Sequence, residues 1–361
     1  MKTGIIGLPQ VGKTSLFKIL TGAKLEDRGF SNPREAHLGV AKVPDDRLDK
    51  LAALYKPKKT MYAAIEYADV AAIGQDALKE TNFLTNLRNV DALIHVLRAF
   101  EDDSIPHVGP IDPLRDIRNV EFDLMISDLT QVEKRLERLE KDLKRGKTDE
   151  LLREQALLLR CKESLEAEKA IRELEITPDE KKLIRGFTFL SQKPILYVVN
   201  ISESTTLGTD LEAATAKYGL TEISSRPNAG ATAICGKVEA ELSEMEEDEA
   251  AEFLEGYGLT ESGLRRLIRK SYELLGLVSF FTVGEDECRA WTVPVNSRAQ
   301  EAAGAIHSDL EKHFIRAETI HWDTLLAAGS EAVARSQGTL RLEGKEYRVQ
   351  DGDVMHIRHS G

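Results

Sequence analysis

Cysteine is scarce in this chain of 361 residues, which has only Cys161, Cys235 and Cys288. Their spacing shows no pairing, which excludes a disulfide framework and a cysteine-based zinc site. Long apolar runs are also missing, since stretches such as Ile195–Val199 are far shorter than the ~20 residues that a membrane helix needs. The first residues, MKTGIIGLPQ, lack the shape of a signal peptide and are typical of a first strand. These absences favour a cytoplasmic protein that does not enter a membrane.

Basic residues are outnumbered, with 49 Lys and Arg against 61 Asp and Glu and a net charge of −12. The molecule as a whole would repel phosphates, which argues against non-specific binding to nucleic acid and gives no reason to expect DNA as a partner. A local basic face remains compatible with this balance. Part of the acid is concentrated in Glu239–Glu255, a run that is typical of a solvated helix face or an acidic loop.

The composition that remains, 42% hydrophobic and 30% charged residues, is typical of a globular protein with two or three domains. In residues 1–100, short apolar strands such as MYAAIEYADV alternate with helical patterns. This βαβ order predicts an α/β fold with a mostly parallel sheet. The strand pattern returns at Pro194–Asn200, and a last amphipathic helix is expected at 262–276. We therefore predict one α/β domain from residues 1–120 and 190–276.

A helical insertion interrupts this domain. A heptad seam with apolar residues at alternating steps of three and four is formed by Leu129, Val132, Leu136, Leu139 and Leu143. The sequence RGKTDE breaks this pattern, and a second helical stretch at Leu151–Leu174 follows. We predict an antiparallel helical hairpin over residues 121–189. Residues 277–361 mix strands and helices, which predicts a separate α+β module.

A phosphate-binding motif follows the first strand. GIIGLPQVGKTSLF contains Gly7-x-x-x-x-Gly12-Lys13-Thr14, a complete Walker A pattern between a predicted strand and a predicted helix. The glycines let backbone N–H groups face phosphate oxygens, Lys13 supplies a point charge, and the Thr14 hydroxyl suits Mg²⁺. The candidate loop contacts are Gln10, Val11, Gly12, Lys13, Thr14 and Ser15.

A carboxylate for the metal is predicted at Asp69, which ends the strand EYADV at the place of a Walker B residue. Thr14 and Asp69 are therefore the candidate Mg²⁺ ligands, and Lys13 and Asp69 are the candidate catalytic residues.

The stretch ILYVVNISES raises the question of which base the site reads. The usual guanine motif is Asn-Lys-x-Asp, but here Asn200 is followed by Ile201 and, two residues later, Glu203. Asn200 can serve either purine, since both have N7. A carboxylate aimed at the N1 edge suits guanine and repels the N1 lone pair of adenine, and Glu cannot keep the forked geometry of Asp. This pattern is typical of a purine reader without guanine selectivity, and a plain strand exit is the alternative.

Several motifs resemble the YchF, or Obg-like ATPase, family of P-loop proteins. GLPQVGKTSLF resembles its Walker A motif, VPDDRLDKLAALYKPKKT the segment after its first switch, and NISE its altered base motif. LRNVDALIHVLRAFED resembles the strand whose Phe, here Phe100, lines the base site. RAWTVPVNSRAQEAAGAIHSDLEKHFIRAE and LEGKEYRVQDGDVMHIR resemble its C-terminal TGS domain, so the resemblance covers nearly the whole chain.

The resemblance implies a P-loop G domain, a coiled-coil hairpin, a ubiquitin-like TGS domain and ATP with Mg²⁺ as ligands. It also implies contact with the ribosome, through its RNA, or with a translation factor. The loop with Cys235 would approach the base, and this cysteine occupies a position linked to redox sensitivity, although a plain buried role is the alternative.

The sequence departs from the family pattern around the γ-phosphate. The family motif Asp-x-Ala-Gly is Asp69-Val70-Ala71-Ala72 here, and alanine lacks the backbone freedom of glycine. Pro33 stands near the place of a switch Thr, and Ile73, as in the family, replaces a catalytic Gln. A slow ATPase is therefore one hypothesis, and a docking module that holds nucleotide without hydrolysis, or a GTPase, remains open.

Two basic clusters are candidate surfaces for ribosomal RNA. The helix GLRRLIRK would carry Arg265, Arg266, Arg269 and Lys270 on one face. The hairpin would add Lys134, Arg135, Arg138, Lys141, Lys144 and Arg145. Solvated helix faces paired with nearby Glu are the alternative interpretation of both.

Overall fold

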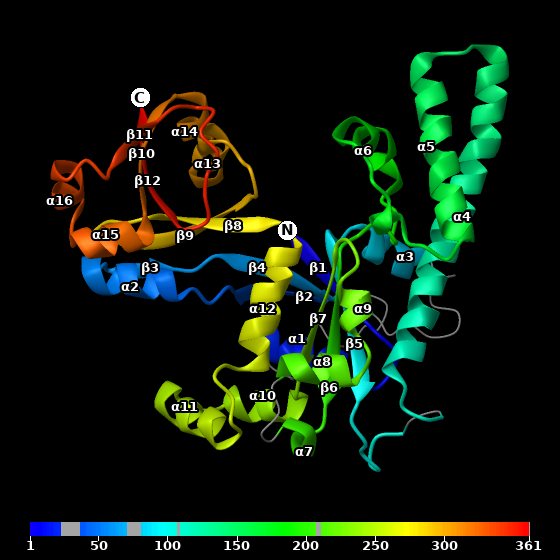
Figure 1. Cartoon of the computed structure of the whole chain (residues 1–361), viewed down its shortest axis with the longest axis horizontal. Coiled ribbons are helices and arrows are strands. Elements are labelled where there is room, and N and C mark those ends of the chain that lie inside the picture. The colour runs from blue at the N-terminus through cyan, green and yellow to red at the C-terminus, as the bar shows by residue number, and fades with distance from the viewer. Residues whose placement is uncertain (23–36, 71–80, 107–108, 207–210, 361) are drawn as a thin grey trace. The chain divides into compact units, whose positions relative to one another are not determined.

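The computed structural model describes residues 1–22, 37–70, 81–106, 109–206 and 211–360, and Figure 1 shows the chain from its N-terminus in blue to its C-terminus in red. These residues form two compact units. One consists of Met1–Val40 and Glu66–Lys270, and the other of Ala41–Ile65 and Ser271–Gly361. Among the described residues, no helix combines the length and the apolar character needed to cross a membrane.

The first unit is built on a six-stranded sheet in the order β2-β4-β1-β5-β6-β7. Its strands are β1 (Lys2–Ile6), β2 (His37–Lys42), β4 (Ala64–Asp69), β5 (Ala92–Ala99), β6 (Ile195–Ile201) and β7 (Ala229–Ile234). The pairings of β1 with β4 and β5, of β5 with β6, and of β6 with β7 are parallel, as predicted from the βαβ order. Strands β5 and β6 are buried along almost their whole length, which explains their continuous apolar sequences.

Helices follow these strands in the chain. They are α1 (Lys13–Thr21), α3 (Thr81–Arg88), α7 (Glu203–Thr206), α8 (Leu211–Lys217), α9 (Thr221–Ser224), α10 (Gly236–Leu242), α11 (Glu247–Gly256) and α12 (Gly263–Leu274). Because parallel strands end at a common edge, the segments that follow β1, β4, β5, β6 and β7 meet there. All of the residues that the sequence predicts to bind the nucleotide or its metal lie in or next to these segments.

Two long helices, α4 (Pro113–Arg145) and α5 (Asp149–Glu166), form the insertion and lie side by side in Figure 1. Helix α4 begins earlier than predicted, because Asp112 caps it and Pro113 occupies its first turn. Helix α5 ends earlier than predicted and is followed by η3 (Ile171–Glu173), α6 (Pro178–Ile184) and η4 (Arg185–Phe187). Heptad residues such as Val132 and Leu139 pack against Leu157, Leu158 and Cys161 in one apolar core.

The carboxylate of Asp128 joins this insertion to the strand layer. Asp128 is fully buried in α4 and accepts hydrogen bonds from Leu190 N at 2.9 Å and from Ser191 N and Oγ at 2.7 Å each. Leu190 and Ser191 lie shortly before β6, so the base of the hairpin is fastened next to a central strand of the sheet.

The second unit has its own six-stranded sheet, in the order β11-β10-β12-β8-β9-β3. Its elements are α2 (Asp46–Tyr55), β3 (Lys59–Met61), β8 (Leu277–Thr282), β9 (Glu287–Pro294), α13 (Ala299–Ile306), α14 (Ser308–Lys312), β10 (Phe314–His321), α15 (Trp322–Ala328), α16 (Glu331–Ser336), β11 (Arg341–Glu343) and β12 (Asp353–His359). Strand β3 pairs in parallel with β9. The strand predicted in MYAAIEYADV is confirmed as β4, which begins only at Ala64, and Met61 belongs to β3 instead.

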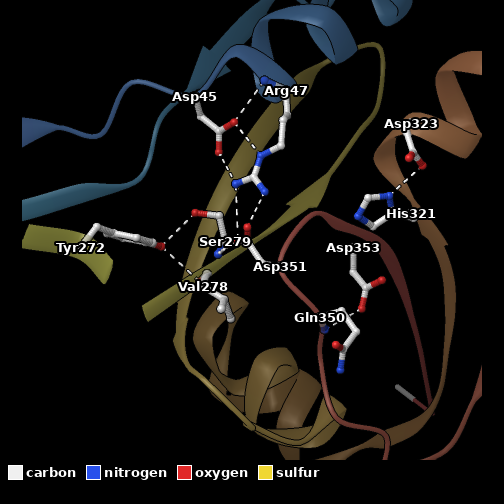
Figure 2. Close-up of polar contacts among 10 residues, drawn as sticks. All are labelled: Asp45, Arg47, Tyr272, Val278, Ser279, His321, Asp323, Gln350, Asp351 and Asp353. Atoms are coloured by element: carbon white, nitrogen blue, oxygen red, sulfur yellow. Dashed lines mark hydrogen bonds and ion pairs between the residues drawn. The ribbon is translucent and has the colours of Figure 1, made fainter. Parts of the chain in front are cut away.

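Segment 41–65 is fastened to the C-terminal residues by a polar network, which Figure 2 shows. Arg47 donates to Asp45 Oδ1 at 2.9 Å and to Asp351 Oδ2 at 2.6 Å, and Asp351 accepts from Ser279 N at 2.9 Å. Segment 41–65 therefore belongs to the same compact unit as the C-terminal residues, whereas the sequence pattern predicted that it belongs to the α/β domain.

Candidate nucleotide-binding site

The loop between β1 and α1 needs glycine at two positions. Gly7 has φ 152°, and a Cβ there would lie 2.6 Å from the backbone oxygen of Val96. Gly12 has φ 97°, and a Cβ there would lie 2.6 Å from Asn200 Nδ2. Gln10 also takes a positive φ, of 63°. The Walker A glycines therefore serve both the curvature of the loop and its close packing against β5 and β6.

The N-terminus of α1 carries no side-chain cap. Gly12 is the N-cap residue and has no side chain that could accept from the first N–H groups of the helix, so among the described residues these groups are left for another acceptor. An anion placed there would satisfy these groups and meet the positive end of the helix. The local geometry thus fits the phosphates that the motif predicts.

Lys13, Thr14 and Asp69 come together behind this loop. The Thr14 hydroxyl donates to Asp69 Oδ2 at 2.9 Å, and Asp69 Oδ1 is buried with no hydrogen-bond partner among the described residues. Burial lowers the pKa of Lys13, and the charge of Asp69 opposes this shift. Burial raises the pKa of Asp69, opposed by the charge of Lys13 and the Thr14 hydroxyl.

The Lys13 ammonium and the Asp69 carboxylate are thus both removed from water, and each compensates the charge of the other only in part. A phosphate beside Lys13 and a cation beside Asp69 would supply the compensation. The unpaired Oδ1 of Asp69 and the neighbouring Thr14 hydroxyl supply oxygen ligands, which Mg²⁺ prefers. The residues present therefore fit a magnesium–nucleotide complex.

Asn200, at the end of β6, connects three segments of the site. Its Nδ2 donates to Val11 O at 3.1 Å, and its Oδ1 accepts from Gly236 N at 2.9 Å. One of the two Nδ2 hydrogens is left for a base. Asn200 therefore joins the loop after β1 to the segment after β7, a structural role that the sequence motif did not reveal.

Arg98 in β5 supports the candidate site residue Phe100, and no sequence motif pointed to it. Its side chain is only 1% exposed, and its guanidinium carbon lies 4.5 Å from the centre of the Phe100 ring. The guanidinium also donates to Phe100 O and Ile105 O, each at 3.1 Å. Arg98 thereby holds both the ring and the backbone of the segment that follows β5. The signal was present in the sequence, as a single Arg inside the buried strand ALIHVLRA.

Ile201 and Cys235 are buried, each 2% exposed, and belong to the core of the first unit. The structure places both beside Asn200, at the ends of β6 and β7. Their side chains pack inward, so any part that they take in nucleotide binding falls to their backbone groups. Gln10 on the loop is exposed, as are Thr14 and Ser15 in the first turn of α1, and Val11 in the loop is buried.

The Glu203 carboxylate already has two partners. Lys237 Nζ lies 2.5 Å from Oε2, and the Tyr257 hydroxyl donates to Oε1 at 2.7 Å. Lys237 lies in the first turn of α10, and Tyr257 caps the end of α11. Neither residue was selected from the sequence, because no short motif connects them to Glu203.

The structure corrects one of the two predicted basic surfaces. On α12, Arg266 is buried and donates to Thr232 Oγ1 at 3.1 Å and to Ala233 O at 3.2 Å. Arg269 pairs with Glu261 at 2.7 Å, and Lys270 donates to Ala231 O. Arg266 therefore supports the fold and is not available to RNA, so the prediction that all four cations share an exposed face of α12 was wrong for this residue. The predicted switch residues Pro33, Ala71, Ala72 and Ile73 lie outside the described residues.

A parallel α/β sheet with a Walker A loop after its first strand and a carboxylate beside the loop threonine defines the class of P-loop proteins. Comparison with known proteins narrows this class. A family model named YchF-GTPase_C, described as "Protein of unknown function (DUF933)", matches residues 277–360. The "Ribosome-binding ATPase YchF" of Bacillus subtilis (strain 168) is 44% identical over 364 residues, which cover 99% of this chain and 99% of that protein.

The protein of the same description from Escherichia coli O157:H7 is 40% identical over 362 residues, which cover 99% of this chain and 98% of that protein. A solved structure, described as "Structure of the Schizosaccharomyces pombe YchF GTPase", is 33% identical, with a TM-score of 0.85 and coverage of 99% of this chain and 97% of that one. The chain therefore belongs to the YchF family.

Proposed function

We propose that this chain binds ATP with Mg²⁺, hydrolyses it slowly, and binds the ribosome in a manner linked to its nucleotide state. The observation that carries the proposal is the group of Lys13, Thr14 and Asp69 at the uncapped N-terminus of α1. Among the described residues, one carboxylate oxygen of Asp69 has no hydrogen-bond partner. Lys13 would neutralise phosphate charge, and Thr14 with Asp69 would hold the metal.

ATP is preferred to GTP in this proposal because the guanine-reading Lys and Asp are replaced. Ile201 packs in the core, and both oxygens of Glu203 are engaged by Lys237 and Tyr257. A carboxylate held in this way has its charge partly matched and gains less from the N1–H and N2 amine of guanine. The relatives are described as an ATPase in one case and a GTPase in another, so the base preference is tested by direct measurement.

Equilibrium competition of ATP and GTP against a labelled nucleotide tests this choice. We expect ATP to displace the label at lower concentration than GTP. GTP binding ten times more tightly, a difference of about 1.4 kcal/mol, would refute it. Release of phosphate from ATP, measured with and without ribosomes, distinguishes a slow hydrolase from a docking module that only holds nucleotide.

The ribosome as partner rests on the names of the bacterial relatives and on one surface of this chain. Four cations lie one above another on the outward side of α4, namely Lys134, Arg138, Lys141 and Arg145. All four are exposed, and within the described part of the chain none of them has an ion pair. By contrast, Arg135 on the flank of the same helix pairs with Glu154 at 2.7 Å.

We propose that this surface, the α4 stripe, contacts phosphates of ribosomal RNA. In a chain with a net charge of −12, an unpaired row of cations on a projecting helix favours a polyanionic partner. Binding should then weaken steeply as salt rises, because each neutralised phosphate releases counterions. These partners also favour the cytoplasm as the location of the protein.

Co-sedimentation with ribosomes over a series of salt concentrations tests the α4 stripe. Reversing the four cations to Glu should abolish pelleting at moderate salt. A matched control exchanges Lys and Arg within the stripe, as in Lys134→Arg and Arg138→Lys, and should pellet normally because the charge is kept. Normal pelleting of the charge-reversed variant would remove the α4 stripe as the contact while leaving ribosome binding itself open to other surfaces.

A further inference from the structure

Glu203 occupies the sequence position of the guanine-reading Asp, three residues after Asn200, and its carboxylate is engaged by the protein itself. Lys237 and Tyr257 each take one of its two oxygens, at 2.5 Å and 2.7 Å. These same donors, Lys237 first and Tyr257 second, hold the pKa of Glu203 below its ordinary value. The carboxylate is therefore ionised, and its charge is matched by the ammonium beside it.

The two partners of Glu203 belong to the helices that follow β7, since Lys237 lies in α10 and Tyr257 ends α11. Lys237 comes directly after Gly236, whose N–H is bound by Asn200 Oδ1 at 2.9 Å. Tyr257 ends α11, the next helix of the chain, and its ring packs near that of Phe253 with centres 5.0 Å apart. The Asn200 contact thus holds the backbone from which Lys237 projects, and an aromatic pair positions the ring of Tyr257.

Stability of the fold does not account for this arrangement. The side chain of Lys237 is 67% exposed and that of Glu203 is 37% exposed, and ion pairs of this kind add little to folding. The arrangement does matter for a ligand. A bare carboxylate near the base edge would repel the N1 lone pair of adenine and accept from the N1–H of guanine. A carboxylate that already accepts from an ammonium and a hydroxyl does both more weakly, because its charge is partly matched.

We propose that Lys237 and Tyr257 are specificity-determining residues, which engage the Glu203 carboxylate so that the pocket accepts adenine and gains less from guanine. This inference rests on the proposed preference for ATP. It adds that the preference depends on the two partners of Glu203, and that the substitution of Asp by Glu is not sufficient by itself.

The test is equilibrium competition of ATP and GTP against a labelled nucleotide, with the full chain. The double variant Lys237→Met with Tyr257→Phe removes both donors while keeping the bulk of both side chains. We expect the preference for ATP over GTP to fall roughly tenfold, the scale of one hydrogen bond to a charged group. Adding Glu203→Gln to this variant should restore ATP binding, because the amide carries no charge to repel adenine.

Two control variants separate this effect from a general loss of charge. Lys237→Arg keeps the pair with Glu203 and should keep the wild-type ratio. Lys162→Met breaks the pair of Lys162 with Glu133 in the hairpin, at 3.0 Å, and should also leave the ratio unchanged.

The outcomes are distinguishable. A wild-type protein without any preference for ATP would overturn the proposed nucleotide choice and this inference with it. A wild-type preference that persists in the double variant would overturn the inference alone. An equal loss of affinity for both nucleotides, with a normal circular dichroism spectrum, would also overturn it, because Lys237 and Tyr257 would then support the shape of the pocket and not the choice of base.

Discussion

Replacing Asn200 by alanine removes two hydrogen bonds that join separate segments of the nucleotide pocket. The bonds run to Val11 O at 3.1 Å and from Gly236 N at 2.9 Å, and Asn200 itself is only 7% exposed. A typical intramolecular hydrogen bond contributes about 1 kcal/mol, so the free energy of unfolding of this unit should fall by about 2 kcal/mol without nucleotide. The buried groups left without partners can only add to this loss.

The same loss should appear in nucleotide binding. If binding must first order the loop and the segment around Gly236, a deficit of about 2 kcal/mol corresponds to a roughly 30-fold weaker affinity for ATP. The variant Asn200→Asp is a sharper probe, because it keeps the acceptor for Gly236 N and turns a carboxylate oxygen toward Val11 O. We expect it to be at least as damaging as alanine.

Hydrogen exchange at the Gly236 amide, together with urea unfolding and calorimetric titration of ATP, measures these effects. The Asn200→Ala protein without nucleotide should show faster exchange at Gly236 and a lower unfolding midpoint. Unchanged exchange and stability, with only the ATP affinity reduced, would show that Asn200 reads the base without organising the pocket, and the structural reasoning would be refuted.

Three further predictions concern the phosphate site, the hairpin and turnover. Lys13→Ala should abolish detectable binding of nucleotide while leaving the circular dichroism spectrum normal, because the change removes the charge at the phosphates; calorimetric affinity equal to wild type would contradict this role. Asp128→Ala should lower the free energy of unfolding by about 2–5 kcal/mol in urea titrations, because it leaves the buried N–H groups of Leu190 and Ser191 without their acceptor; a change below about 0.5 kcal/mol would mean that other groups take over. Without ribosomes, ATP turnover should be on the order of 10⁻³ s⁻¹ or slower, because the altered switch residues give little closure over the γ-phosphate. For the same reason ATP and ADP should bind with similar affinities. Turnover near ~1 s⁻¹, or ATP affinity roughly a hundredfold above that of ADP, would show that other groups have assumed these roles.

The sequence by itself determined the features that depend on local pattern. The Walker A motif, the βαβ order of the first hundred residues and the heptad seam each follow from spacing along the chain, and strand β1, helix α1 and the buried face of α4 lie where these patterns predict them. Thr14 and Asp69 could be selected as partners because the motif and the strand end imply their positions, and their contact at 2.9 Å agrees. Membership of the YchF family, predicted from several motifs, is confirmed by relatives at up to 44% identity over the full chain.

Only the tertiary structure decided which side chains serve each other over long distances in sequence. Arg266 looked like part of a basic surface, but its guanidinium is buried against β7, because a helical pattern shows which residues share a face and not what that face packs against. Segment 41–65 looked continuous with the α/β domain, yet Arg47 binds Asp351, a partner that lies 304 positions away. Arg98 with Phe100, and Glu203 with Lys237 and Tyr257, form contacts whose members have no common motif, since hydrogen bonds and ring contacts depend on where the backbone brings groups together and not on their order in the chain.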